Sequence, residues 1–208
     1  MANGGKAELF QIATADYLPR IYEELEREKQ LTYRLMYVEA LARVPSGFSQ
    51  SRLAKTAVED KDEQVRELAF TMLELEHFNR DQIARVLAGY FVSPDNVDVQ
   101  RAGFIIGELG SDVVLPQMIK ALNTRHTFKN PGGVQQGRTG STFGSDGSAG
   151  LNLGGPPPTV ERDVKNDEVR KALIRLTKQR HLDYNEANWQ AWYVKNYTLY
   201  DYDFRYVK

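Results

Sequence analysis

The sequence contains no cysteine among its 208 residues. This absence excludes disulfide bonds, thiol catalysis and cysteine-ligated metal sites. It is compatible with the cytoplasm, which is the default expectation, and with the periplasm if the chain is an excised domain. Residues 1–5 show no basic start followed by an apolar stretch, so we predict that they are not a signal peptide.

Long apolar runs and an excess of either charge are also absent from the sequence. No apolar run approaches the length of about 18 residues that a transmembrane helix needs, so we expect no membrane partner. The formal net charge is −1, whereas a dedicated nucleic-acid binder usually carries a strong basic excess. We therefore do not expect nucleic acid as a partner, although a local basic face stays open.

The sequence has few residues that could carry chemistry. None of its three histidines stands at a metal-ligand spacing from another: His77, His126 and His181. The sequence contains neither the glycine–serine motif of a hydrolase nucleophile nor the glycine-rich loop that binds phosphates. We therefore predict no catalytic residues, no cofactor and no metal ion.

An internal repeat is the most informative pattern that is present. Leu31, Val65 and Val99 lie 34 residues apart, and a second apolar series has the same spacing: Leu41, Leu75 and Leu109. A period of this length is typical of stacked helical hairpins. One such hairpin cannot bury its apolar face alone, so neighbouring hairpins must cover it.

Apolar residues at helical spacing predict a series of helices before residue 124. Their expected ranges are 17–28, 31–43, 49–58, 62–76, 80–91 and 97–109, followed by a helix that starts at Ser111 and Asp112. Asn79 is the expected cap of the helix over 80–91, and Gly110 fits the position just past the helix over 97–109. Gly103 and Gly107 lie on the inner side of that helix, where glycine costs about 1 kcal/mol relative to alanine. We attribute them to the close approach of a neighbouring helix.

The segment 124–164 interrupts the helical pattern. Residues 129–158 contain nine glycines, four prolines and three serines, a composition that does not build a packed helix pair. The flanks 123–128 and 159–164 are short and rich in β-branched or aromatic residues. We therefore predict a two-stranded ribbon that projects from the stack and ends in a mobile glycine-rich tip. A disordered insertion without strands is the alternative.

The C-terminal segment 165–208 is predicted to hold a last helical repeat, a capping helix and an aromatic arm. Residues 184–208 carry nine of the 22 aromatic residues of the chain. Aromatic side chains cover the end of a helix stack with few residues, and they anchor interfaces when exposed. Between Tyr200 and Tyr206 aromatic and charged residues alternate, which indicates a strand or an extended arm that adds to the ribbon or lies along the helices. The candidate interaction residues are Trp189, Trp192, Tyr193, Tyr200, Tyr202, Phe204 and Tyr206.

Several short motifs resemble the HEAT-repeat family. The inner-helix openings are DEQVR at 62–66, DVQR at 98–101 and NDEVRKAL at 166–173. The run 106–116 resembles the transition between the two helices of one repeat. The aromatic run 176–193 resembles a tryptophan-containing module that closes the stack in bacterial, planctomycete-type HEAT-repeat proteins.

The resemblance implies an all-α fold, an α–α superhelix of HEAT-like helical hairpins that carries a β-ribbon insertion and an aromatic C-terminal arm. The predicted division is a flexible N-terminus, helical repeats, the inserted ribbon and the last repeat with its cap, over 1–16, 17–123, 124–164 and 165–208. In HEAT repeats an acidic residue and an arginine often bridge adjacent repeats. The resemblance therefore implies a structural role for Asp62, Arg66, Arg101 and Arg170. Asp62 and Arg66 are also placed for a pair within one helix.

The leading functional hypothesis is a non-catalytic helical-repeat scaffold whose concave surface binds a protein or peptide. Two alternatives stay open. One is a helical-repeat enzyme, either bilin lyase-like or DNA glycosylase-like; the latter needs a basic face with an aromatic and acidic pair, for which Trp189, Trp192 and Glu186 are the nearest residues. The other is a structural module for homo-oligomerisation within a larger assembly, in which the ribbon pairs with a neighbouring subunit.

Overall fold

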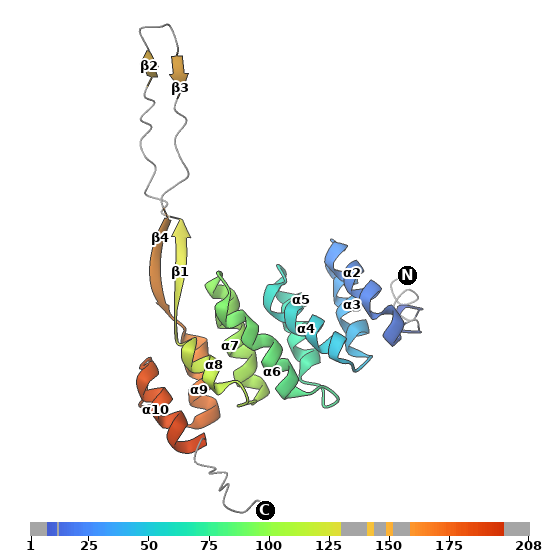
Figure 1. Cartoon of the computed structure of the whole chain (residues 1–208). Coiled ribbons are helices and arrows are strands. Elements are labelled where there is room, and N and C mark those ends of the chain that lie inside the picture. The colour runs from blue at the N-terminus through green and yellow to red at the C-terminus, as the bar shows by residue number, and fades with distance from the viewer. Residues whose placement is uncertain (1–7, 12, 130–140, 144–148, 152–158, 198–208) are drawn as a thin grey trace, which may run out of the picture. The chain divides into compact units, whose positions relative to one another are not determined.

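The computed structural model describes residues 8–11, 13–129, 141–143, 149–151 and 159–197. The chain divides into two compact units (Figure 1). The helical unit comprises residues 1–124 and 165–208, and the insertion unit comprises residues 125–164. The described part of the chain is mostly helical with two small two-stranded sheets, which confirms the predicted all-α class.

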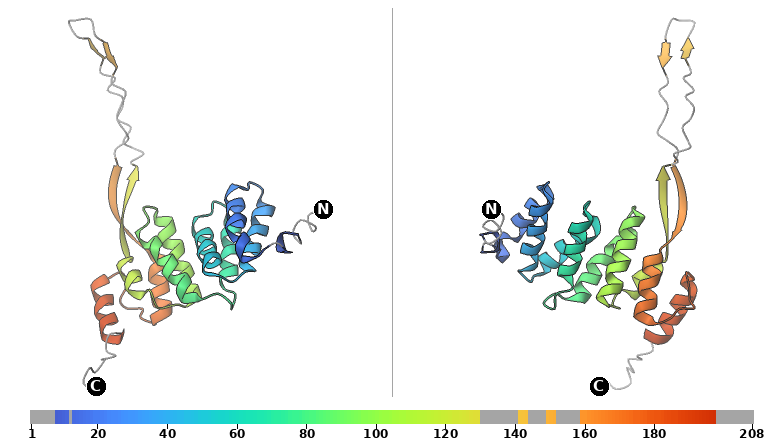
Figure 2. Two further views of the ribbon diagram at one scale, coloured as in Figure 1. Left: turned by 45° about the vertical axis from the view of Figure 1, so that its right-hand side comes forward. Right: turned by 180° about the vertical axis from the view of Figure 1, so that it is seen from behind.

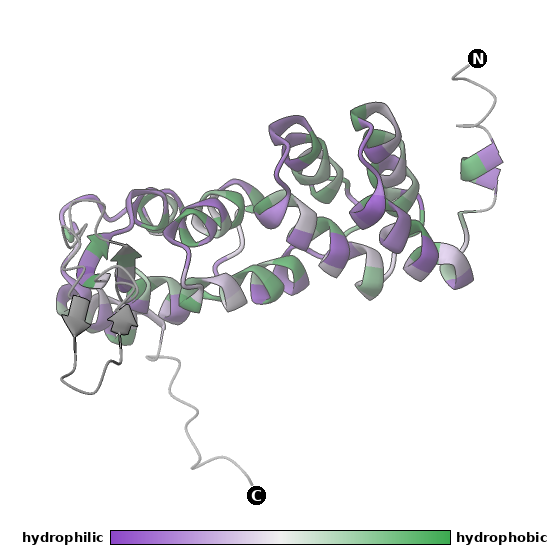
Figure 3. Cartoon of the chain, turned by 90° about the horizontal axis from the view of Figure 1, so that it is seen from above, coloured by the Kyte–Doolittle hydropathy of each residue, from purple (hydrophilic) through white to green (hydrophobic). Residues whose placement is uncertain are grey.

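The helices of the helical unit pack in succession. Their bounds are α2 Leu18–Arg27, α3 Leu31–Ala42, α4 Gly47–Glu59, α5 Glu63–Leu73, α6 Arg80–Ala88, α7 Asn96–Leu109, α8 Leu115–Lys120, α9 Asp167–Thr177 and α10 Glu186–Tyr197, with 3-10 turns η1 Ala15–Tyr17 and η2 Gly89–Val92. Helix α3 contacts α5, and α7 contacts α9, as the views in Figure 2 also show. Helices α5 and α7 meet through the Phe70 and Phe104 rings, while α2, α4 and α6 follow a second line of contacts and α4 also contacts both α5 and α7. Seen from above, these helices carry apolar and polar residues on different sides, as amphipathic helices between core and solvent do (Figure 3).

Side chains at the helix ends explain where several helices begin. Ser46, Asp62, Asn79 and Asp95 each accept a hydrogen bond from a backbone N–H in the first turn of α4, α5, α6 and α7. The predicted cap at Asn79 is therefore confirmed. Gly110 ends α7 in the left-handed conformation with φ of 75°, which a residue without Cβ adopts at little cost.

The core confirms part of the repeat pattern and corrects the rest. Val65, Val99 and Leu109 are buried, but Leu75 is 39% exposed and lies beyond the end of α5, so the predicted helix over 62–76 is too long at its C-terminus. Helix α5 ends at Leu73, and Leu73 is fully buried. Leu75 lies in the turn that follows the helix. The predicted helix start at Ser111 is also wrong: the Ser111 hydroxyl donates to Asp81 Oδ1 at 2.8 Å, and α8 begins only after that turn.

The N-terminal segment that the sequence predicts to be flexible has some structure. Residues 8–11 are helical, and Leu9 and Phe10 pack against the core of the helical unit.

Helices α7 and α9 approach each other too closely for side chains at two positions of α7. A Cβ atom on Gly103 would lie 2.9 Å from the backbone nitrogen of Val169, and one on Gly107 would lie 2.7 Å from Ala172 Cβ. The two glycines therefore mark a backbone-level contact, as the sequence predicts. Since the insertion lies between α8 and α9 in the chain, this contact joins the helical segments that precede and follow it.

A buried asparagine completes this junction. Asn166 has no exposed surface, and its amide donates to Ala121 O and to Thr124 Oγ1, both at 2.7 Å. Its Oδ1 accepts from Asn96 Nδ2 at 2.5 Å and from Gln100 Nε2 at 3.1 Å. An asparagine side chain has two donors and two acceptor sites, so every one of them is used.

The insertion unit contains the predicted ribbon. Strands β1, Asn123–Lys129, and β4, Thr159–Lys165, pair with each other, and Arg125 Nε donates to Asp163 Oδ1 at 3.0 Å between them. A second antiparallel pair, which the sequence pattern does not predict, joins β2, Ser141–Phe143, to β3, Ala149–Leu151, with Thr142 opposite Gly150. The other residues of the predicted glycine-rich tip lie outside the described residues.

Substitution Gly107→Ala tests the close approach of α7 and α9. Alanine favours a helix by about 1 kcal/mol over glycine, but its methyl group meets the rigid Ala172, and overpacking costs about 1–3 kcal/mol. We expect a net loss of unfolding free energy in urea denaturation. The matched control is Gly89→Ala, since a methyl group on Gly89 would meet no other atom within 4 Å. A Gly107→Ala variant as stable as Gly89→Ala would contradict the contact.

Substitution Asn166→Leu tests the buried amide junction. It removes the hydrogen bonds of the Asn166 side chain, including the bond to the carbonyl of the buried Ala121, and a buried polar group left without its partner costs about 1–3 kcal/mol. We expect a loss of at least about 2 kcal/mol in the same denaturation measurement. Exposed Asn188→Leu on α10 is the control and should change stability little. Equal effects of the two substitutions would refute a special role of Asn166.

Candidate functional site

A small open groove lies between α5 and α7, and we call it the α5–α7 groove. Its volume is about 210 Å³, and its lining is mostly apolar: Ala57, Glu63, Arg66, Glu67, Phe70, Arg101, Phe104 and Ile105. The Phe70 and Phe104 rings meet edge to face with their centroids 5.8 Å apart. Phe104 is 42% exposed, so an aromatic surface faces solvent in this groove.

The repeat explains why the two rings meet. Phe70 and Phe104 are 34 residues apart, which is the spacing of the apolar series in the sequence. Successive helices of the same row therefore present the same position to the same side. Neither residue is among the candidates predicted from the sequence, because those predictions follow the buried positions of the repeat, although the same period contains both rings.

Two arginines of the groove are held by the end of α4. Arg101 Nη1 donates to Val58 O at 2.7 Å, and Arg66 Nη1 donates to Asp60 O at 2.8 Å. The last carbonyls of a helix have no partner within the helix, and the negative end of its dipole attracts cations. The C-terminus of α4 therefore fixes both guanidinium groups at the same place.

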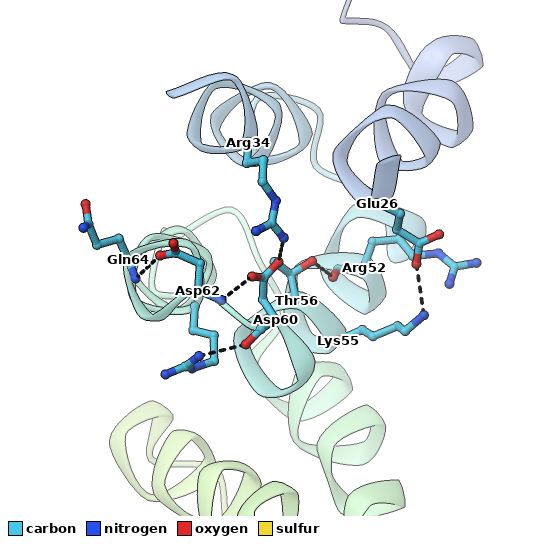
Figure 4. Close-up of polar contacts among 9 residues, drawn as sticks. Glu26, Arg34, Arg52, Lys55, Thr56, Asp60, Asp62 and Gln64 are labelled. Atoms are coloured by element: carbon cyan, nitrogen blue, oxygen red, sulfur yellow. Dashed lines mark hydrogen bonds and ion pairs between the residues drawn. The ribbon is translucent and has the colours of Figure 1, made fainter. Parts of the chain in front are cut away.

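The predicted role of the acidic partner differs from the observed one. Asp62 Oδ1 accepts from the Gln64 N–H at 2.9 Å and caps α5 (Figure 4). In the described part of the chain, Asp62 and Arg66 form no ion pair with each other, because the Arg66 guanidinium is turned to the Asp60 carbonyl. Arg101, in contrast, links α7 to α4.

A buried ion pair fixes Asp60, the residue whose carbonyl binds Arg66. Arg34 of α3 pairs with the Asp60 carboxylate, and both side chains are 8% exposed. Asp60 Oδ1 also accepts from the backbone N–H of Asp62 at 2.8 Å, as Figure 4 shows. Helices α3, α4 and α5 are thus joined at the residue whose carbonyl holds Arg66.

A second aromatic surface lies on α10. Trp192 meets the Tyr197 ring at 5.7 Å, and Tyr193 stacks on Tyr197 at 5.1 Å. Tyr197 donates to Asp112 Oδ2 at 3.2 Å, and burial together with Asp112 raises the pKa of its hydroxyl. These three rings are partly exposed or exposed, so they form a surface that a partner could reach.

Trp189 does not belong to that surface. It is fully buried, and its indole N–H donates to Asp183 O at 2.8 Å. Its candidacy as an interaction residue is therefore corrected: Trp189 packs in the core of the helical unit, while its neighbours Ala187 and Asn188 are exposed. Arg170 supports the same loop, with Nη1 3.6 Å from Asp183 Oδ1 and its guanidinium 5.0 Å from the Tyr184 ring centre. The remaining candidates lie outside the described residues: Tyr200, Tyr202, Phe204 and Tyr206.

A larger pocket of about 350 Å³ lies between α2 and α4 and is lined mainly by charged residues that pair with one another. Lys55 Nζ lies 3.2 Å from Glu26 Oε1, and Tyr90 donates to Glu59 Oε1 at 2.6 Å. The hydrogen bond from Tyr22 holds the pKa of Glu26 below its usual value, with Lys55 adding to the effect. Most of these polar groups pair with one another, but the Nε of Arg34 is buried without a hydrogen-bond partner among the described residues. The α5–α7 groove differs from this pocket in its mostly apolar lining.

The described residues contain no group of three or more histidine, cysteine, aspartate or glutamate side chains placed to hold a metal ion. None of the helices in the described ranges is long and apolar enough to cross a membrane. Comparison of the sequence with protein-family models, with curated proteins and with solved structures gave no match.

Substitution Glu26→Gln tests the pairing in the α2–α4 pocket. The folded-state pKa of Glu26 is lowered, so its stabilising effect is present above the unfolded-state pKa and is lost as pH falls through the folded-state value. We expect the wild-type chain to exceed the variant in unfolding free energy at pH 7, and this difference to shrink below about pH 4. Exposed Glu23→Gln serves as the control. A difference that is the same at pH 3 and pH 7 would contradict this account.

Proposed function

We propose that this chain is a helical-repeat scaffold of HEAT-like α-hairpins that binds a segment of a protein or peptide and catalyses no reaction. The observation that carries the proposal is the α5–α7 groove, where paired aromatic rings lie beside two arginines held by backbone carbonyls. The α10 surface of Trp192, Tyr193 and Tyr197 is a second contact region.

The arrangement of the helices supports the repeat part of the proposal. Helix α3 contacts α5, α7 contacts α9, and α5 meets α7 through the Phe70 and Phe104 rings, so the four helices form one row. Matching positions in successive helices of that row, such as Phe70 and Phe104, share a 34-residue spacing. Repeats that contact only their neighbours produce extended surfaces of this kind, and such surfaces bind partners in solenoid proteins.

The size and chemistry of the groove support a polypeptide partner. Pockets for small molecules usually hold about 300–1,000 Å³, whereas the groove holds about 210 Å³. This space suits one or two side chains of a bound chain better than a whole cofactor. Aromatic and arginine residues are also the side chains that most often contribute large binding energies at protein interfaces.

Selection from a random peptide library with the full chain as bait tests the proposal. We expect enriched peptides whose binding weakens about tenfold or more with Phe104→Glu, because a buried charge replaces an aromatic contact. Val97→Glu is the matched control, since Val97 lies on the same helix, is 47% exposed and does not line the groove.

The two variants separate the outcomes of this selection. Binding that survives Val97→Glu and fails with Phe104→Glu assigns the partner site to the groove. No enrichment, or enrichment that neither substitution changes, would contradict a peptide-binding groove between α5 and α7.

A further inference from the structure

The α5–α7 groove has a chemistry that matches a part of the same sequence. Residues 198–208 read TLYDYDFRYVK, in which four aromatic residues alternate with two aspartates and an arginine. These residues lie outside the described part of the chain. We propose that the occupant of the groove is this C-terminal segment of the same chain, which acts as an internal ligand that an external partner must displace. This inference rests on the proposed peptide-binding function of the groove.

The aromatic residues of the segment fit the apolar part of the groove. Phe70 and Phe104 already meet edge to face, and Phe104 keeps 42% of its surface in solvent. A third ring, from Tyr202 or Phe204, extends this cluster and removes apolar surface from water. The groove volume of about 210 Å³ has room for such a ring but not for a folded domain.

The charged residues of the segment fit the rest of the lining. Arg66 and Arg101 each use one Nη on a backbone carbonyl, which leaves other N–H donors of each fork for a carboxylate. Asp201 and Asp203 supply two carboxylates next to the aromatic residues. The lining also contains two exposed glutamates, Glu63 and Glu67. Their negative charge is complementary to the positive charge of Arg205 in the segment.

The segment starts close enough to reach the groove. Its first residue follows Tyr197, whose hydroxyl is 3.2 Å from Asp112, in the turn just after α7. Helix α7 ends at Leu109 and rises about 1.5 Å per residue, so Phe104 lies about 8 Å before the end of this helix. A segment of 11 residues spans up to about 36–40 Å when extended, which leaves length to pass around α7.

A tethered segment competes effectively with free peptides. A short flexible connection gives an effective concentration in the millimolar range at its own site. A moderate affinity of residues 198–208 therefore keeps the groove occupied in the absence of a partner. A partner with the same aromatic and acidic chemistry would have to bind more tightly than this internal ligand.

The test uses a fluorescent synthetic peptide of residues 198–208 and full-length chains, with fluorescence anisotropy as the readout. Wild-type chain should bind the peptide weakly, because its own segment occupies the groove. The double substitution Tyr202→Ser and Phe204→Ser in the chain should strengthen peptide binding about tenfold or more. Adding Phe104→Glu to that variant should abolish binding, and adding Val97→Glu should leave it unchanged.

A peptide with Asp201→Asn and Asp203→Asn reports on the arginines. We expect its affinity for the double-substituted chain to fall about three- to tenfold, and we expect this loss to shrink as salt concentration rises. Light scattering of the wild-type chain should give a monomer. A dimer that the double substitution dissociates would place the segment in a second copy and overturn docking within one chain.

Failure of this inference can be separated from failure of the proposed function. If peptide 198–208 does not bind the double-substituted chain, while library peptides bind it in a Phe104-dependent manner, the internal ligand is wrong and the groove still binds peptides. If neither binds in a Phe104-dependent manner, both proposals fall.

Discussion

The contact between α7 and α9 is the constraint on which the helical unit depends. At Gly103 and Gly107 the two helices leave no space for a methyl group. The contacting residues Val169 and Ala172 follow an insertion of 40 residues, from 125 to 164. The row of helices therefore continues across the insertion only because α9 fits against a side-chain-free stripe of α7. Asn166 strengthens this junction, since all its hydrogen-bonding groups bind residues that precede the insertion.

At the end of α4, the same two arginines that bind free carbonyls of the helix also line the α5–α7 groove. Helix ends leave carbonyls that need partners, and at the end of α4 these partners are Arg66 of α5 and Arg101 of α7. Anchored in this way, each guanidinium loses less freedom when it meets a partner than an unrestrained surface arginine would. The buried Arg34–Asp60 pair fixes one of the two anchor points. A structural role of these arginines, as the HEAT resemblance implies, is therefore compatible with a role in recognition.

The sequence is most informative where a residue type has one physical explanation. Two glycines on the inner side of a helix require a close neighbour, and the structure has one. Asn79 and Gly110 have the chemistry of helix ends and occupy them. Leu75 and Ser111 mislead because periodicity and capping preference do not say where a helix stops: α5 ends at Leu73, and the Ser111 hydroxyl is used by Asp81.

The burial and the partners of a residue are hard to predict from the sequence when its type is common both in the core and on the surface. Trp189 and Trp192 are equally aromatic and lie three residues apart on one face of α10, yet Trp189 is fully buried and Trp192 packs only partly buried against the core. In the sequence Arg34 has the character of a solvent-facing helix residue. In the structure it pairs with Asp60, which lies 26 residues further along the chain at the end of α4. Phe70 and Phe104 follow the repeat on its exposed side, where apolar residues also occur singly without meaning. The contact between the two rings, from α5 and α7, distinguishes them from apolar surface residues that occur singly.

The electrostatics of the described residues are compatible with the proposed binding role. A catalytic acid or base works best with a pKa near the operating pH. The shifts in this structure move in the other direction: burial raises the pKa of Tyr22 and Tyr90, and a hydrogen bond from Tyr22 lowers that of Glu26. Burial opposes the charge of Lys55, yet its bonds to Tyr22 and Glu26 raise its pKa. Each of these groups is held more firmly in its ordinary charge state at neutral pH. Such pairing links neighbouring helices, for example Lys55 of α4 with Glu26 of α2.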